Sequence, residues 1–140
     1  MKDSITAENV LIVKDFFEAM GSGDRDGMLA LVAEDFEWII PGENWPLAGR
    51  HSGHAGLADV LKKSSEEVEM TYLVPPEFMG QKDRVMVTGI ATGKIKATGK
   101  PFKDYWVFAI TVQDGKLTNI REYIDTQALA HASEMNPGTE

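Results

Sequence analysis

The chain has 140 residues, and its 14 lysines and arginines against 22 aspartates and glutamates give a net charge of −8. Hydrophobic residues make up 43% and charged residues 26%, as in a folded domain with a sizeable core. The chain has no cysteine, which excludes disulfides, thiolate metal sites and cysteine nucleophiles.

Several partners and compartments are also disfavoured by the sequence. Its apolar runs stay far short of the ~20 residues that cross a bilayer, and its first residues lack the apolar core of a secretory signal. The acidic balance and the lack of a Lys/Arg cluster argue against nucleic acid and anionic membranes as partners. We therefore expect a cytoplasmic protein with one domain over residues 1–132, followed by a frayed tail over residues 133–140.

The first part of the chain has the pattern of helices. Apolar residues recur at helical spacing between Val10 and Met20, and Thr6 is placed to cap this first helix. Asp24 is placed to cap a second, shorter helix, and Ser52 a third. Between the second and third helices the sequence predicts a short strand at residues 38–40 and then a loop at residues 43–53.

From about residue 67 onward the pattern changes to strands. β-branched and aromatic residues favour strands at residues 85–87, 105–112 and 120–124. Turn signals separate them at residues 98–101 and 113–116. Pro75 and Pro76 predict an edge or bent strand, while Gly89 and Gly93 predict bulges. Helices followed by antiparallel strands indicate the α+β class.

Several short runs, taken in their order and spacing, resemble a known family. They are VKDFFEAM (13–20), GD (23–24), LVAEDFEW (31–38), PG (41–42), GRHSG (49–53), DGKL (114–117) and REYID (121–125). The chain resembles the SnoaL-like and ketosteroid-isomerase-like proteins of the nuclear transport factor 2-like superfamily. The resemblance implies a conical barrel, in which about three N-terminal helices pack on a strongly curved, mostly antiparallel sheet. It also implies a deep apolar pocket, a dimer and no cofactor.

The resemblance does not carry over one activity. At the places where steroid isomerases hold a Tyr, an Asp and a protonated acid, this chain has Phe16, Ile40 and, approximately, Trp106 or Val107. The REYID run is similar to the end of limonene epoxide hydrolases, but their earlier Arg-x-Asp pair is absent here. SnoaL-type cyclases work with an Asp acid/base in an apolar pocket, and of these activities theirs requires the fewest further site residues.

Asp125 is the first catalytic candidate. Strand alternation places Arg121, Tyr123 and Asp125 on one face, and Glu122 on the other. We assign the first face to the pocket, where an Asp among aromatic rings would have a raised pKa suited to acid/base work. Glu122 is then assigned to the outside or to a dimer contact. The alternative for Asp125 is a surface residue that ends a strand.

His51 is the second catalytic candidate. It precedes the third predicted helix, whose N-terminus would keep the imidazole neutral and able to accept a proton. The alternative is a capping or solvent-exposed histidine, and the same holds for His54. No metal site is predicted, because His51 lies before the helix and the two histidines lack the helical ligand spacing.

Further side chains are candidates for substrate binding. They are Trp38, Trp45, Arg50, Tyr72, Trp106, Arg121 and Tyr123. Trp45 lies in a Pro/Gly loop, which favours a lid over the pocket, whereas most aromatic side chains in a small domain are core. Arg50 would bind a carbonyl or anionic group, or else form a surface ion pair.

The sequence thus predicts a cofactor-free enzyme that carries out acid/base chemistry on a small apolar carbonyl compound. The reaction would be an isomerisation, an aldol-type cyclisation or a hydration, with Asp125 as the acid/base. The alternative is a non-catalytic binding module that uses the same pocket. Because apolar residues lie on both faces of the long strands, we also expect a homodimer through the outer face of the sheet.

Overall fold

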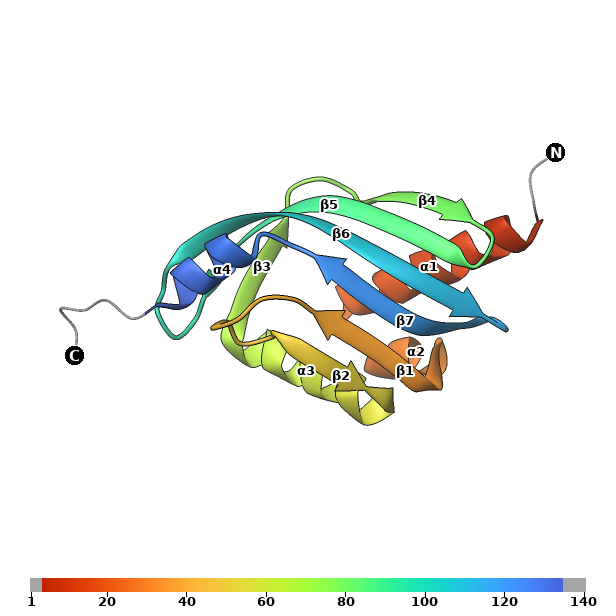
Figure 1. Ribbon diagram of the computed structural model, residues 1–140, viewed down its shortest axis with the longest axis horizontal. Coiled ribbons are helices and arrows are strands. Elements are labelled where there is room, and N and C mark those ends of the chain that lie inside the picture. Colours follow the sequence, from red (N-terminus) through yellow and green to blue (C-terminus); the bar gives the residue numbers. More distant parts are fainter. Residues whose placement is uncertain (1–3, 135–140) are drawn as a thin grey trace.

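The computed structural model describes residues 4–134 and shows helices packed on one curled sheet (Figure 1). The helices are α1 (Ser4–Ser22), α2 (Arg25–Ala30), α3 (Gly53–Glu67) and α4 (Thr126–Ser133). The strands are β1 (Val32–Ile40), β2 (Gly49–Ser52), β3 (Val68–Tyr72), β4 (Glu77–Gln81), β5 (Arg84–Ile95), β6 (Pro101–Gln113) and β7 (Lys116–Tyr123). The predicted α+β class with a curved, mostly antiparallel sheet is confirmed.

The sheet has the strand order β2-β1-β7-β6-β5-β3, with β4 also paired to β5. β1 and β7 run parallel, and the other pairs of this sheet are antiparallel. α1 packs on β4 and β5, α3 packs on β1, β2 and β3, and α4 packs on β6 at one end (Figure 1). The long strands β5 and β6 therefore form the wall that the helices cover from one side.

Local sequence signals explain several of the helix and turn boundaries. Asp24 caps α2, as predicted, by accepting a hydrogen bond of 2.9 Å from the backbone N–H of Gly27. The β6–β7 hairpin turns at Asp114 and Gly115, whose φ angles of 51° and 77° fit a type I′ turn. The predicted N-cap at Thr6 is wrong, because α1 begins at Ser4 and the Thr6 hydroxyl accepts from the backbone N–H of Lys82.

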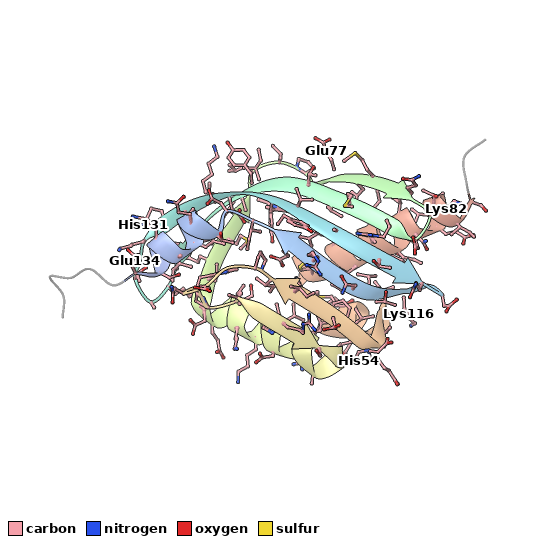
Figure 2. The ribbon with its side chains drawn as sticks, in the orientation of Figure 1. His54, Glu77, Lys82, Lys116, His131 and Glu134 are labelled. Carbon is pink, nitrogen blue, oxygen red and sulfur yellow. The ribbon has the colours of Figure 1, made fainter. Side chains whose placement is uncertain are left out.

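That contact joins the start of α1 to the turn between β4 and β5. Lys82 lies beside the first turns of α1 in Figure 2, and its carbonyl also accepts a hydrogen bond of 2.8 Å from the Asn9 amide. Asn9 is one of the few buried polar residues, and this bond satisfies its amide. The Thr6 hydroxyl is thus used by a tertiary contact, which local capping preferences could not predict.

Three parts of the predicted order of elements need correction. β1 is longer than predicted, the expected loop at residues 43–53 contains β2, and α4 was not predicted. Pro75 and Pro76 separate β3 from β4, and both strands pair with β5, which confirms that the prolines interrupt a strand at the edge of the sheet. The tail prediction for residues 133–140 falls mostly outside the described residues.

The bulges predicted at Gly89 and Gly93 are also wrong. β5 and β6 pair without a register shift from Arg84 to Lys94. The glycines instead make room for aromatic rings, because a Cβ at Gly89 would lie 2.3 Å from the indole of Trp106. A Cβ at Gly93 would lie 2.2 Å from the backbone carbonyl oxygen of Glu69 and 2.7 Å from the ring of Phe102.

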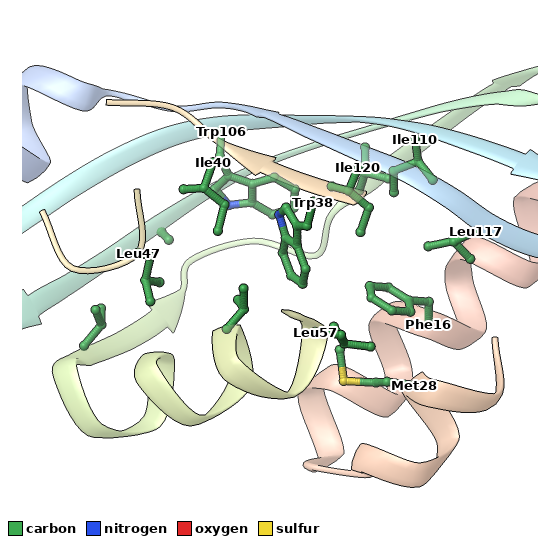
Figure 3. Close-up of a cluster of buried hydrophobic side chains, with 14 of the residues drawn as sticks. Phe16, Met28, Trp38, Ile40, Leu47, Leu57, Trp106, Ile110, Leu117 and Ile120 are labelled. Atoms are coloured by element: carbon green, nitrogen blue, oxygen red, sulfur yellow. The ribbon is translucent and has the colours of Figure 1, made fainter. Parts of the chain in front are cut away.

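The core lies between the concave face of the sheet and α1, α2 and α3 (Figure 3). Phe16 and Met28 of the helices face Ile110, Leu117 and Ile120 of the strands, and all five are at most 1% exposed. Among residues 4–134 no helix is long and apolar enough to cross a membrane.

Candidate functional site

The two faces of β7 are the reverse of the sequence prediction. Glu122 is 8% exposed and belongs to the inner face, whereas Tyr123 is 56% exposed and Arg121 is also exposed. The predicted alternation is correct, but the assignment of the faces is wrong. The physical reason is that Ile120 has the same parity as Glu122 and is fully buried, so the core fixes the orientation of both.

Asp125 does not line the interior, contrary to the prediction. It is exposed and caps α4, where its carboxylate accepts a hydrogen bond of 3.0 Å from the backbone N–H of Ala128. It also lines a surface hollow of about 410 Å³ together with Tyr105, Val107 and Tyr123. The strand residues of this hollow belong to the outer face of the sheet, so Asp125 does not lie among the buried aromatic rings of the interior.

The buried carboxyl at this end of β7 is that of Glu122. The indole Nε1–H of Trp38 on β1 donates a hydrogen bond of 2.7 Å to its Oε1. Burial, and to a smaller extent the charge of the nearby Asp104, raise the pKa of Glu122 from its ordinary 4.5 to about 8, although the hydrogen bond from Trp38 lowers it. Glu122 is therefore a neutral carboxylic acid over most of the physiological range.

Two more acidic side chains lie near Glu122, and together we call Tyr72, Asp104 and Glu122 the acid cluster. Asp104 is 5% exposed, and burial raises its pKa, although the backbone N–H of Asp125 donates a bond of 2.8 Å to it. Burial of the hydroxyl also raises the pKa of Tyr72, and the charges of Glu122 and Asp104 add to this. Tyr72 as a residue is still 53% exposed, so it marks the solvent side of the cluster.

Strand register explains why the acid cluster forms. Tyr72 of β3 lies opposite Ala91 of β5, which in turn lies opposite Asp104 of β6. Glu122 of β7 lies opposite Phe108 of β6. The cluster thus lies on the concave face of three strands, with Tyr72 and Asp104 at one level and Glu122 four residues further along β6. Trp38 of β1 joins it through its hydrogen bond to Glu122.

Aromatic rings surround the acid cluster and fill the interior. Trp106 lies 5.1 Å from Phe108 and stacks at 6.0 Å on Phe17 of α1, measured between ring centroids. Trp38 lies 5.9 Å from Phe108, and Tyr72 meets Trp106 edge to face at 6.1 Å. Trp38 and Trp106 therefore lie at the centre of the region where a ligand pocket was predicted (Figure 3).

The side chains of the remaining sequence candidates do not belong to the acid cluster. Trp45 is buried in its own loop, where its Nε1–H donates a bond of 2.9 Å to the Pro41 carbonyl. Arg50 lies on the surface in an ion pair of 3.3 Å with Glu37, the alternative given for it above. The structure therefore brings together Trp38, Tyr72 and Trp106 but separates them from Arg50 and from the outward Arg121, Tyr123 and Asp125.

His51 is buried, but its contacts tie it to neighbouring backbone and to α3. Its Nε2 lies 3.0 Å from the Leu47 carbonyl, and its Nδ1 lies 3.9 Å from the Asp59 carboxylate. The Nε2 of His54 lies 2.9 Å from the carbonyl of Val32. Within residues 4–134, no three His, Asp or Glu side chains come close enough together to hold a metal ion.

Sequence reasoning missed Glu122 and Asp104. A usable signal for Glu122 was present, because the isoleucines at positions 120 and 124 flank it at strand spacing and favour the inner face. Asp104 gave a weaker signal of the same kind, with Phe102 and Trp106 on either side.

Comparison with solved structures identifies close relatives. An NTF2-like protein from Burkholderia xenovorans LB400 is 64% identical, with a TM-score of 0.89 over 92% of this chain and 98% of that one. TerC, crystallised with polyporic acid, is 27% identical, with a TM-score of 0.77 over 90% of this chain and 98% of its own. A candidate polyketide cyclase from Xanthomonas campestris shares the fold, at 20% identity and a TM-score of 0.78 over 94% of this chain and all of its own.

No curated protein matches the chain. The model of the SnoaL-like domain matches residues 13–120, which is most of the chain and includes β1 to β6. The chain therefore belongs to the SnoaL-like family.

Proposed function

We propose that this protein is a small-molecule enzyme of the isomerase or cyclase kind, and that Glu122 is its acid/base. The observation that supports this best is a buried carboxyl whose pKa of about 8 lies close to physiological pH. A group with such a pKa exchanges protons efficiently in both directions. Asp125, the sequence candidate, is replaced because it is exposed and caps a helix.

The proposed chemistry is proton transfer next to a carbonyl group. The ionised Glu122 takes a proton from the carbon beside the carbonyl, and the neutral acid returns it at another position of the same substrate. Trp38 holds Oε1, so Oε2 is the oxygen that faces the substrate. The step balances within the substrate and needs no cofactor.

The side chains of the interior indicate the class of substrate. The rings of Trp38, Trp106 and Phe108 present flat apolar surface, and no lysine or arginine of residues 4–134 is buried. An anionic substrate would meet the acid cluster without a compensating cation. We therefore propose a neutral, flat carbonyl compound. TerC, a relative of this chain, was crystallised with polyporic acid, which supports a small organic ligand for this fold.

Substrate entry is proposed beside Tyr72. Tyr72 and Met70 belong to the inner side of β3 but are 53% and 38% exposed, so this edge of the cone is open to solvent. Their strand ends at the connection to β4, which contains Pro75 and Pro76. Rotation of Tyr72 away from Trp106 would uncover the acid cluster.

Deuterium exchange at the α-carbon of 1-tetralone in D₂O, followed by ¹H NMR, tests the proposal. The wild-type protein should accelerate exchange, with a rate that rises with pH through a midpoint of about 8. Glu122→Gln should lower the catalysed rate by roughly 10²–10⁴-fold, the usual share of acid/base catalysis. The matched control Asp125→Asn should keep the wild-type rate. Full activity of a folded Glu122→Gln variant would contradict the proposal.

The second candidate function is a non-catalytic binding module. The observation that favours it is the ring-filled interior. Five pairs of aromatic rings, each of which includes Trp106 or Phe108, have centroids 5.1–6.1 Å apart. A wild-type protein that binds 1-tetralone and leaves its exchange at the background rate would support this alternative.

We also propose a homodimer through the outer face of the sheet. Tyr105 and Tyr123 are 63% and 56% exposed there, and they surround the hollow of about 410 Å³ with Val107. Exposed aromatic residues gathered on one face are typical of protein interfaces. Sedimentation at micromolar concentration should show a dimer, and Tyr123→Glu should give a monomer. A wild-type monomer would contradict the proposal.

A further inference from the structure

Trp106 holds a buried N–H group with an unusual environment. Its indole Nε1 is shielded from solvent and has no hydrogen-bond partner among residues 4–134. The other two tryptophans differ, since Trp38 donates to Glu122 and Trp45 donates to the carbonyl of Pro41. A buried donor without a partner costs folding free energy, so its retention in the interior needs an explanation.

Packing prevents this indole from turning to reach a protein acceptor. Phe17 stacks on it at an interplanar angle of 11°, and Phe108 packs at 5.1 Å on the same ring system. On β5, Gly89 lets the indole lie against the strand, because a Cβ there would be 2.3–3.0 Å from three of its carbon atoms. Phe17, Phe108 and the backbone at Gly89 thus hold the ring in place, and with it the direction of its N–H.

The indole of Trp106 lies beside the acid cluster. Asp104 lies two residues before Trp106 on the same face of β6, and Tyr72 contacts the indole at 6.1 Å. Glu122 lies on β7 opposite Phe108, the next inner-face residue after Trp106. Glu122 keeps one carboxyl oxygen free of Trp38, so two polar groups are available on adjacent strands.

We propose that the Nε1–H of Trp106 donates a hydrogen bond to a carbonyl or hydroxyl oxygen of a neutral, flat ligand bound inside the cone. This inference rests on the proposed function for the place of the substrate beside Glu122, and it adds a binding residue and a ligand chemistry. Trp106 then fixes the orientation of the carbonyl group, while Glu122 handles the proton.

The chemistry of the surroundings selects this ligand class. An indole nitrogen only donates, so its partner must be an acceptor, which excludes a bare ammonium group at this position. Carboxylates and phosphates are disfavoured by the neighbouring Asp104 and by the lack of a buried lysine or arginine within residues 4–134. Stacked rings favour a flat molecule.

The test compares two probes that differ only in the acceptor. 1-Tetralone carries one carbonyl oxygen, and tetralin has the same bicyclic skeleton without it. Wild-type protein should bind 1-tetralone roughly 3- to 10-fold more tightly than tetralin, as measured by calorimetry, which is the usual worth of one neutral hydrogen bond. Trp106→Phe should bring this ratio close to one. Because packing changes affect both probes alike, the ratio isolates the N–H group.

Trp45→Phe is the matched control, because it also removes a buried indole N–H, but one that already has a protein partner. This variant should keep the wild-type ratio. The indole ¹H–¹⁵N signals give a second readout that needs no folded variant of Trp106. The signal of Trp106 should move downfield with 1-tetralone and much less with tetralin, while that of Trp45 stays in place.

The outcomes separate this inference from the proposed function. A ratio near one in the wild type, no binding of 1-tetralone up to its solubility limit, or an unchanged ratio in Trp106→Phe would each overturn the role of Trp106. Glu122→Gln that loses exchange activity but keeps the probe ratio would support both proposals. Glu122→Gln that keeps full exchange activity, beside a ratio lost in Trp106→Phe, would overturn the proposed function alone.

Discussion

Glu122 and Asp125 are carboxyl groups three residues apart, and the fold gives them opposite surroundings. Glu122 is on the concave face of β7, buried and bonded to the indole of Trp38. Asp125 follows the end of β7, exposed to solvent and bonded to the first turn of α4. The first has a pKa raised to about 8 by burial, while the second stabilises a helix. The comparison shows that position in the sheet, more than residue type, decides which acid can do chemistry at neutral pH.

The largest expected effect is on the pH dependence of stability. The pKa of Glu122 is about 8 in the folded protein and about 4.5 in the unfolded chain, so the folded state holds one more proton between these values. The contribution of Glu122 to the free energy of unfolding is therefore fully present below pH 4.5. It falls by about 1.4 kcal/mol per pH unit as the pH rises to 8.

Glu122→Gln removes this contribution. Its free energy of unfolding should fall less steeply than that of the wild type between pH 4.5 and 8, and it should exceed the wild-type value at pH 8. Urea unfolding at several pH values measures both curves, and their difference isolates Glu122 from Asp104, whose pKa is raised as well. Trp45→Phe is a control that should lower stability by a similar amount at every pH. Parallel curves for wild type and Glu122→Gln would contradict the buried neutral acid.

A smaller effect is expected when Glu122 loses its hydrogen-bond donor. Trp38→Phe leaves a buried carboxyl oxygen without a partner, which should cost about 1–3 kcal/mol in addition to the lost ring volume. The same change should raise the pKa of Glu122 further, since the Trp38 bond lowers it. Chemical denaturation and carboxyl NMR measure the two effects. A lower pKa in Trp38→Phe would show that the bond does not stabilise the ionised form.

For Asp125, we expect that replacing the side chain weakens the N-cap of α4. Asp125→Ala should lower the free energy of unfolding by about 0.5–2 kcal/mol, because the N–H of Ala128 loses its acceptor. Asp125→Asn should keep most of this stability, since Asn is an equally good N-cap. Thermal melts of the two variants provide the measurement. Equal losses in both would indicate that the charge, and not the cap, is what matters.

The smallest effect is expected at Arg50. Its ion pair with Glu37 is exposed, so Arg50→Ala should change stability by no more than about 1 kcal/mol. Exchange of 1-tetralone should continue at the wild-type rate, because Arg50 lies away from the acid cluster. A large loss of exchange in this variant would place the substrate near β2.

The sequence predicted the fold class well, because the signals involved are local or cover most of the chain. Helical periodicity in residues 10–20, the cap at Asp24 and the turn at Asp114 and Gly115 were all confirmed. The role of Thr6 could not be predicted in the same way, since its hydroxyl bonds to the distant Lys82. β2 and α4 are short elements whose stability comes from pairing and packing more than from their own pattern.

The candidate site was harder to predict, since a period of two defines two faces but does not say which is buried. For β7 the answer depends on how the strand aligns with β1 and β6, both of which pair with it through a register shift. The aromatic candidates Trp38 and Trp106 were found because most tryptophans of a small domain lie in its interior, and Tyr72 packs against Trp106. Asp104 and Glu122 were missed because buried acids go against the usual rule for charged residues.

The most direct test of this account is the titration of the Glu122 carboxyl. ¹³C NMR of the side-chain carboxyl, with Glu122→Gln to assign the signal, gives its midpoint without any substrate. The structure predicts a midpoint of about 8, caused mainly by burial on the concave face of β7. A midpoint near the ordinary 4.5 would show that Glu122 is ionised and solvated at neutral pH, and it would contradict the proposed acid/base.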